Sequence, residues 1–232
     1  MKKQDALKRY LKVICLCLAA TFILGACSKE SGTPVQFGKE ESFRIARINV
    51  HDFGSVVFRL YTDEEEDICN KFIDLAKSGY YNGKPFFYIV EDYLLLAGES
   101  SEDHEEKRAL GKASEKMHPF LGSLCVSYKI GTQVDLSNFY IVTLGNEQLK
   151  NIEELIETKG YTLLDYIKFG YKTELTHDEL ELYRQYGGAP WLDGHTAVFG
   201  QAYDGLDVLD RIVEAHTSDP DTEIVIESIE TN

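Results

Sequence analysis

Positive charge is scarce in this chain of 232 residues, which holds 24 Lys and Arg against 39 Asp and Glu. Residues 1–26 carry five of the basic side chains and only one acidic one, so the rest of the chain has a formal charge of −19. Such a surface repels phosphate backbones and anionic lipid headgroups, although solubility alone is a sufficient reason for the acidity. We therefore expect no nucleic acid partner, and any hold on a membrane must come from something other than charge.

The chain also lacks a long hydrophobic run. The longest one, residues 13–25, is shorter than the about 20 residues with which a helix crosses roughly 30 Å of hydrocarbon. It follows a segment rich in lysine, as in an export signal, and it ends in Leu24-Gly25-Ala26-Cys27, which resembles the lipobox of bacterial lipoproteins. We predict a lipoprotein signal peptide at residues 1–26 and lipidation of Cys27. A plain signal peptide or a buried N-terminal helix is the alternative.

Cysteine is nearly absent from the predicted mature protein, which keeps only Cys69 and Cys125 beside the lipidated residue. Two thiols without a short spacing do not make a metal motif. No phosphate loop or Ser/His/Asp arrangement is visible either, so we expect no metal and no cofactor. Both thiols are expected to be small buried residues, and a disulfide stays open because the predicted compartment is oxidising.

Polar residues follow Cys27, and residues 27–42 are predicted to be a lipidated, flexible tether. Residues 43–232 are enough for one domain with a single core. The predicted location is the cell envelope, where the lipid anchors the protein to a membrane outside the cytoplasm, on its periplasmic or surface face.

Short strand-like segments dominate the predicted domain. Alternation of apolar and polar residues, or short apolar runs, predict strands at 43–50, 55–61, 86–90, 93–96, 122–128, 139–143, 197–202 and 224–229. Helical spacing predicts helices at 63–78, 146–158, 162–170, 177–186 and 206–213. Many short strands with few helices favour an antiparallel sandwich or barrel.

Three segments of the domain carry a family resemblance, namely residues 54–61 with 70–83, residues 137–141, and residues 191–200 continuing through 205–212. Together and in this order, they resemble cyclophilins, a family of peptidyl-prolyl cis/trans isomerases. The resemblance spans about residues 43–229. It implies a mainly β fold, namely a closed eight-stranded antiparallel barrel with two capping helices, and it marks about residues 144–189 as a helical insertion.

The resemblance also implies a site for a proline-containing peptide. In the family an arginine weakens the resonance of the X–Pro amide, whose rotation barrier is roughly 18–20 kcal/mol. In this sequence the arginine position is Tyr88, a neutral phenol without the guanidinium fork. Loss of one preorganised donor typically costs about 10²–10³ in rate. The implied substrate-binding residues are Tyr93, Leu94, Leu96, Ser127, Tyr128, Asn138, Tyr140, Trp191, Leu192 and Thr196.

Several of these positions depart from the family. Leu96 stands for a glutamine and Thr196 for a histidine, whereas Trp191 matches. His195 lies one place earlier than the family's histidine and would point to the opposite face of a strand, so it is not assigned that role. The nearest cations in sequence that could replace the arginine are Lys84, Arg108 and Lys129.

The sequence supports two main hypotheses. The first is a peptidyl-prolyl cis/trans isomerase-like protein that assists folding of exported proteins at the envelope, with weakened activity because of Tyr88. The second is a non-catalytic cyclophilin-like module that binds proline-containing peptides or an envelope partner through the pocket and the helical insertion at about residues 144–189. A surface nutrient-binding lipoprotein is a weaker third idea. In the first two, the partners are proline-containing segments or unfolded exported proteins, and the membrane through the lipid on Cys27.

Overall fold

The computed structural model describes residues 34–38, 43–99, 108–110, 116–127 and 133–232. The predicted signal peptide, the predicted lipidation site Cys27 and the candidate site residue Tyr128 lie outside these ranges. Within the described part of the chain, no helix combines the length and the apolar character that crossing a membrane requires.

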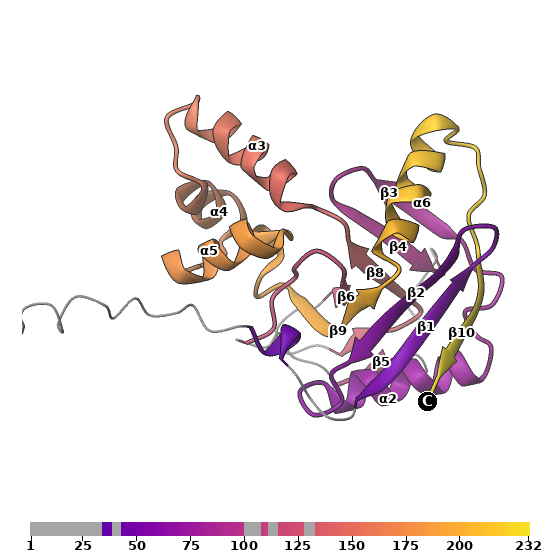
Figure 1. The fold of residues 1–232 in the computed structure, drawn as a ribbon. Helices are drawn as coiled ribbons and strands as arrows, with labels where there is room; N and C mark the ends of the chain where they lie inside the picture. Colours follow the sequence, from indigo (N-terminus) through magenta and orange to yellow (C-terminus); the bar gives the residue numbers. More distant parts are fainter. Residues whose placement is uncertain (1–33, 39–42, 100–107, 111–115, 128–132) are drawn as a thin grey trace, which may run out of the picture. The chain divides into compact units, whose positions relative to one another are not determined.

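Eight strands form one antiparallel sheet with the order β10-β1-β2-β9-β6-β8-β4-β3 (Figure 1). These strands are β1 (Arg44–Val50), β2 (Gly54–Leu60), β3 (Phe86–Val90), β4 (Leu94–Gly98), β6 (Ser123–Ser127), β8 (Asn138–Val142), β9 (Thr196–Asp204) and β10 (Ile226–Thr231). A second, two-stranded sheet pairs β5 (Arg108–Ala109) with β7 (Val134–Asp135). The mainly β class and the eight strands are confirmed, with boundaries close to those predicted.

The predicted closure of the barrel needs a correction. The outer strands of the sheet, β3 and β10, are not joined by a continuous ladder. Instead, segments 83–86 and 224–226 exchange backbone hydrogen bonds of 2.7–2.9 Å, and Pro85 forms an isolated bridge with Val225. Proline has no N–H to donate, which suits it to the end of a strand rather than to a full ladder. The sheet thus curls towards closure and is joined at one corner only.

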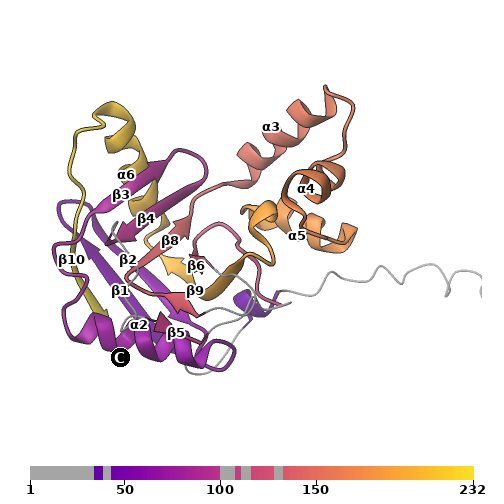
Figure 2. The same cartoon turned by 180° about the vertical axis from the view of Figure 1, so that it is seen from behind.

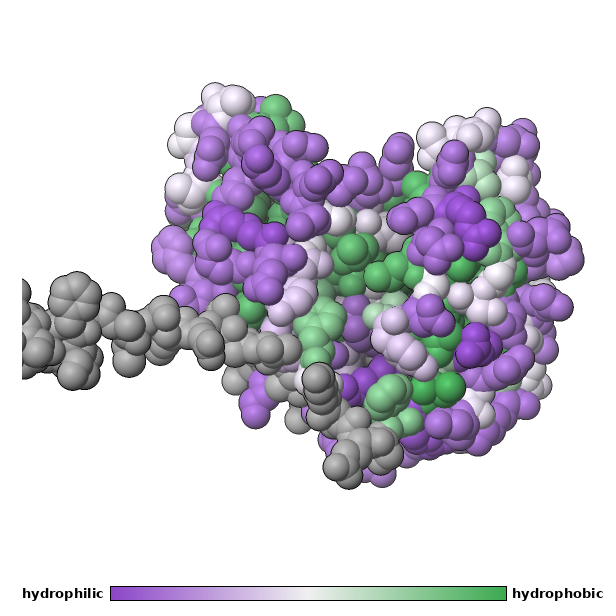
Figure 3. Space-filling model, viewed as in Figure 1, coloured by the Kyte–Doolittle hydropathy of each residue, from purple (hydrophilic) through white to green (hydrophobic). Residues whose placement is uncertain are grey.

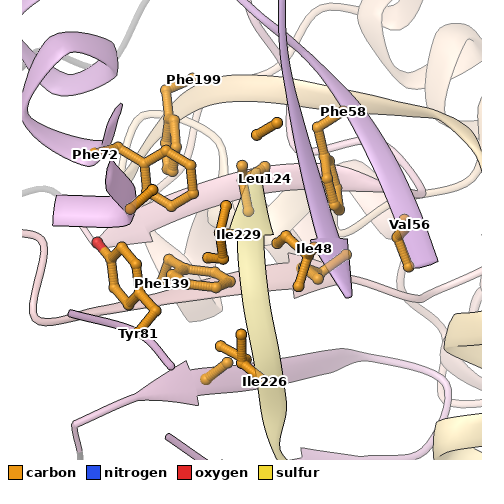
Figure 4. Close-up of a cluster of buried hydrophobic side chains, with 14 of the residues drawn as sticks. Ile48, Val56, Phe58, Phe72, Tyr81, Leu124, Phe139, Phe199, Ile226 and Ile229 are labelled. Atoms are coloured by element: carbon orange, nitrogen blue, oxygen red, sulfur yellow. The ribbon is translucent and has the colours of Figure 1, made fainter. Parts of the chain in front are cut away.

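The inner face of the sheet carries the main hydrophobic core. Figure 4 shows its large side chains pointing towards one another from strands far apart in sequence. The ring of Phe139 lies 5.6 Å from that of Phe72 and 5.4 Å from that of Tyr81, measured between centroids. Removing such a ring costs about 3–5 kcal/mol, because the cavity it leaves closes only in part.

Two helices cover opposite ends of the sheet, as Figures 1 and 2 both show. The helix α2 (Glu66–Lys77) buries Ile68, Phe72 and Ile73 on one face, and α6 (Leu206–Ser218) buries Val208 and Leu209. Acidic residues in the first turn of each helix are favourable for the helix dipole. Two capping helices were predicted, and both are confirmed.

The predicted insertion consists of three helices between β8 and β9. These are α3 (Asn146–Glu157), α4 (Leu163–Tyr171) and α5 (His177–Tyr186), followed by the short 3-10 helix η3 (Pro190–Leu192). The insertion begins and ends at one place, since Gly188 N donates to Leu144 O at 2.7 Å. The capping box of Thr176 and Glu179 starts α5, as predicted. The apolar residues of the insertion pack with those on the outer face of the sheet and form a second core.

The segment Pro34–Gly38 corrects the predicted extent of the tether. Val35–Phe37 forms a short 3-10 helix, η1. The buried amide of Gln36 donates to His118 O at 2.7 Å and accepts from His118 N at 2.7 Å. The Phe37 ring stacks on Tyr186 at 4.5 Å. These residues belong to the folded unit, because a buried amide and a stacked ring hold them in place. A composition argument cannot detect such long-range contacts.

Candidate functional site

The register of the sheet places three candidate site residues in one row. Tyr88 pairs with Leu96 across β3 and β4, and Leu96 pairs with Tyr140 across β4 and β8. Residues directly opposite one another in a sheet share a face. Leu95 and Phe139, one place away, belong to the inner core, so this row lies on the outer face. A bulge between Phe86 and Tyr88 shifts the register of β3, so Phe86 faces the inner core while Tyr88 lies on the outer face.

The floor of the candidate site consists of buried side chains, two of which carry a hydroxyl group. Leu94, Tyr140 and Thr196 are all buried. The hydroxyl groups of Tyr140 and Thr196 are hydrogen-bonded to each other. Burial raises the pKa of the Tyr140 phenol well above its usual value, so the ring remains a neutral donor and acceptor. One of the two hydroxyls donates to the other, which keeps its own proton for a further acceptor.

Trp191 of η3 and Tyr93 of the β3–β4 turn form the aromatic wall of the site. Their ring centroids lie 5.9 Å apart, and Trp191 Nε1 donates a hydrogen bond of 3.2 Å to Tyr93 Oη. Both rings are partly buried and pack against the second core, as Leu96 and Leu192 do. The Tyr93 hydroxyl thus takes up the only polar donor of the indole ring.

Two further predicted residues lie at the rim. Ser127 is exposed at the end of β6, opposite Thr196. Asn138 begins β8 and donates from Nδ2 to Glu99 O at 3.4 Å. The structure therefore brings together nine of the ten predicted substrate-binding residues on one face, and the tenth, Tyr128, lies outside the described residues.

Tyr88 has no charged neighbour that replaces the arginine among the described contacts. Its side chain is 57% exposed. Lys84, one of the cations suggested by the sequence, lies 3.3 Å from the Glu99 carboxylate and 4.4 Å from the centre of the Tyr80 ring. Lys129 lies outside the described residues. In the part of the chain that the structure describes, no three His, Cys, Asp or Glu side chains are grouped to hold a metal ion.

The binding-module hypothesis gave the insertion a part in binding, but the sequence did not indicate which of its residues reach this site. The end of α4 reaches η3, where the Tyr171 ring lies 6.0 Å from that of Trp191. Thr173 Oγ1 lies 3.3 Å from Trp191 O, and His195 Nε2 lies 3.3 Å from Tyr171 O. The aromatic composition of α4 was the only local signal, since a contact between distant segments leaves no spacing pattern.

A buried polar cluster fixes the loop that carries Trp191. Asp193 Oδ2 lies 2.7 Å from His118 Nδ1 and accepts a hydrogen bond of 2.7 Å from Tyr183 Oη. Burial lowers the pKa of His118, but the hydrogen bond and charge of Asp193 outweigh it and raise the pKa above 6.5. The cluster joins the loop before β6, the helix α5 and the residues after η3, so insertion and site are positioned together.

The two thiols take no part in this chemistry. Cys69 and Cys125 are buried and free, which confirms the expectation of small buried residues. Cys125 lies in register with Tyr140 beneath the site, and burial raises the pKa of its thiol well above the usual value. It is therefore a packing residue rather than a nucleophile.

An antiparallel eight-stranded sheet with a helix at each end and an aromatic outer face defines a cyclophilin-like protein. Residues 45–231 match the family described as "Cyclophilin type peptidyl-prolyl cis-trans isomerase/CLD", and the chain belongs to this family.

Similar proteins agree with this assignment. The protein named "Putative peptidyl-prolyl cis-trans isomerase" in Staphylococcus saprophyticus is 28% identical over 193 residues, which are 76% of this chain and 86% of that protein. The protein of the same name in Staphylococcus epidermidis is 26% identical over 205 residues, 84% of this chain and 96% of that one. A crystal structure of a cyclophilin type peptidyl-prolyl cis-trans isomerase of Cryptosporidium parvum has a TM-score of 0.56 at 17% identity, covering 82% of this chain and 98% of that one. At this identity the structural likeness shows the fold alone. A second structure of the Cryptosporidium protein, described as in the presence of the dipeptide Ala-Pro, has a TM-score of 0.52.

Proposed function

We propose that this protein binds proline-containing segments of exported proteins at the cell envelope and accelerates their cis/trans isomerisation only weakly. One observation carries the proposal. The outer face keeps an apolar and aromatic surface around Trp191, Tyr93 and Leu96, while the position expected to hold the catalytic arginine is Tyr88, which is exposed. The surface supports binding of a proline ring, and the phenol supplies less electrostatic stabilisation of a twisted amide than a guanidinium does.

The Tyr140–Thr196 pair adds a polar group to the floor of this face. Both hydroxyl groups are buried and hydrogen-bonded to each other. One hydroxyl of such a pair donates, and the other keeps its own proton for a further acceptor, so the pair still offers one donor to a peptide carbonyl. Family relatives named as isomerases, and a similar structure described as in the presence of the dipeptide Ala-Pro, support proline peptides as ligands.

A protease-coupled isomerisation assay tests the catalytic part. The folded protein at micromolar concentration, with a proline tetrapeptide as substrate, is expected to accelerate isomerisation measurably, and no acceleration would refute the isomerase function. Binding is measured separately by titrating proline peptides into the protein and into its Trp191→Ala variant. Weaker binding to the variant is expected, and identical affinities would refute this face as the site.

The second candidate is a binding module without catalysis. The exposure of Tyr88 favours it, and so does the ion pair of Lys84 with Glu99, because this pair engages one of the cations that the sequence suggested as a replacement for the arginine. Peptide binding that depends on Trp191, together with no acceleration of isomerisation, would select this alternative.

Attachment to a membrane rests on Cys27 and is a proposal from the sequence. We expect the intact protein, expressed in a bacterial host, to incorporate labelled palmitate and to sediment with membranes. The Cys27→Ser variant should lose the label. An unlabelled wild-type protein would contradict lipidation and would leave the proposed peptide binding untouched.

A further inference from the structure

The insertion adds aromatic rings to the candidate site in an unbroken series. Ring centroids are 5.9 Å apart from Tyr93 to Trp191, 6.0 Å from Trp191 to Tyr171 and 5.9 Å from Tyr171 to Tyr166. We call these four residues the aromatic strip. It runs from the β3–β4 turn, across η3, onto α4, so strand and insertion residues share one surface. Figure 3 shows hydrophobic residues gathered between the insertion helices and the sheet.

The helix α4 exposes its aromatic residues and buries its aliphatic ones. Leu163 and Ile167, four residues apart, are buried in the second core. Tyr166 and Tyr171 are 41% and 43% exposed. Single exposed apolar residues are ordinary on protein surfaces, whereas a contiguous aromatic row indicates an interaction site. The core requires only the buried face of α4, so stability does not explain the exposed rings.

The strip is held in position by contacts of the backbone. Lys172 ends α4 in the left-handed region, with φ of 60°, and its N–H donates to Lys168 O at 3.1 Å. The following Thr173 bonds to Trp191 O, and Tyr171 O contacts the His195 ring. Partial burial and the neighbouring hydroxyls of Tyr166 and Tyr93 raise the pKa of Tyr171, as expected for phenols held close together. A surface fixed in this way loses little entropy when a ligand binds.

We propose that Tyr166 and Tyr171 form a subsite for an aromatic side chain of the polypeptide whose proline occupies the face at Trp191. The proposal rests on the proposed function and specifies its substrate class, namely proline segments with a nearby aromatic residue. Side chains on one face of an extended peptide are about 7 Å apart, two residues at about 3.3–3.4 Å each. Each step of about 6 Å along the strip therefore corresponds to about two residues, which places the aromatic residue two to four positions from the proline.

The experiment uses Trp191 as its own reporter, because it is the single tryptophan of the chain. Synthetic peptides with one Ala-Pro bond in an alanine and lysine background carry Phe two or four positions before or after the proline. A Phe-free peptide and a peptide with the proline replaced by alanine serve as controls. Affinity is taken from Trp191 fluorescence titrations and checked by calorimetry. Aromatic contacts of this kind predict about 2- to 10-fold tighter binding for Phe on one side of the proline.

Variants then locate the gain. In Tyr166→Leu and in Tyr171→Leu we expect the Phe peptide to bind no more tightly than the Phe-free peptide. The matched control is Tyr161→Leu, which changes an exposed tyrosine of the same insertion outside the strip and should keep the gain. Circular dichroism checks that each variant is folded. If Tyr171→Leu does not fold, Tyr166→Leu alone decides the outcome, because Tyr166 stands at the end of the strip, whereas Tyr171 contacts both Tyr166 and Trp191.

Three results would count against the proposal in different ways. Equal affinities for Phe and Phe-free proline peptides overturn the subsite and leave the proposed function standing. A gain that persists in both strip variants also overturns it, because the aromatic side chain then binds elsewhere. Equal affinities for peptides with and without proline overturn the proposed function, and the subsite with it.

Discussion

Replacing Tyr88 by arginine tests the proposed function most directly, since it restores the group that the family resemblance expects at this position. Tyr88 pairs with Leu96, which pairs with Tyr140, so a guanidinium at residue 88 would stand at the edge of the apolar face. A preorganised donor in a closed site contributes about 10²–10³ in rate. Residue 88 is 57% exposed, so solvent screens a large part of that effect. We scale the logarithm of this rate effect by the buried fraction of residue 88. The result is a predicted gain in kcat/KM of about tenfold, which corresponds to about 1.4 kcal/mol of activation free energy.

The assay is protease-coupled isomerisation with wild-type protein and Tyr88→Arg side by side. The matched control is Tyr203→Arg, because Tyr203 is also a tyrosine on a strand, is 55% exposed and lies outside the candidate site. Tyr88→Lys adds a charge without the planar fork and should give a smaller gain. A folded Tyr88→Arg protein that binds proline peptides but shows the wild-type rate would refute the idea that the missing guanidinium limits catalysis. An equal gain in Tyr203→Arg would show that the effect is one of net charge.

Three further predictions concern stability and reactivity. Gly98→Ala should lower the free energy of unfolding by about 1–3 kcal/mol in urea titrations, because Gly98 has φ of 111° and an added Cβ would collide with the β7–β8 turn. Gly160→Ala should lower it less, because Gly160 also has positive φ but no atom lies within 4 Å of the added Cβ. Equal losses in the two variants would show that the collision does not cause the destabilisation. Asp193 raises the pKa of His118, so the stability that this pair contributes is fully present below the unfolded pKa of about 6.5 and is lost as the pH rises through the folded pKa. His118→Asn should therefore lower the free energy of unfolding more at about pH 5.5 than at about pH 9. A loss that does not depend on pH would exclude the pair as its source. Burial raises the pKa of Cys69 to about 12, so iodoacetamide should label it, by mass spectrometry, only after unfolding, and rapid labelling of the native protein would contradict its burial.

Local sequence patterns were enough to predict most of the elements. Alternation of apolar residues located the strands within a few positions, and helical spacing located α3, α4 and α5, since these patterns arise from which side of an element faces a core. The family resemblance then predicted that eight strands form one antiparallel barrel, which local patterns do not show. It also predicted ten substrate-binding positions, of which the structure gathers nine on one outer face.

Three features of the structure that the sequence did not predict depend on contacts between distant segments. The barrel is joined at one corner only, Gln36 draws the predicted tether onto the folded unit, and Asp193 ties the site loop to α5. None of these leaves a periodic signal, because each depends on a single pair brought together by the fold. The sequence by itself identified the family, and through the resemblance it predicted that Tyr88 stands at the arginine position. Only the tertiary structure decided that the insertion extends the aromatic surface of the site, since a ring on α4 meets Trp191 through packing and not through any spacing along the chain.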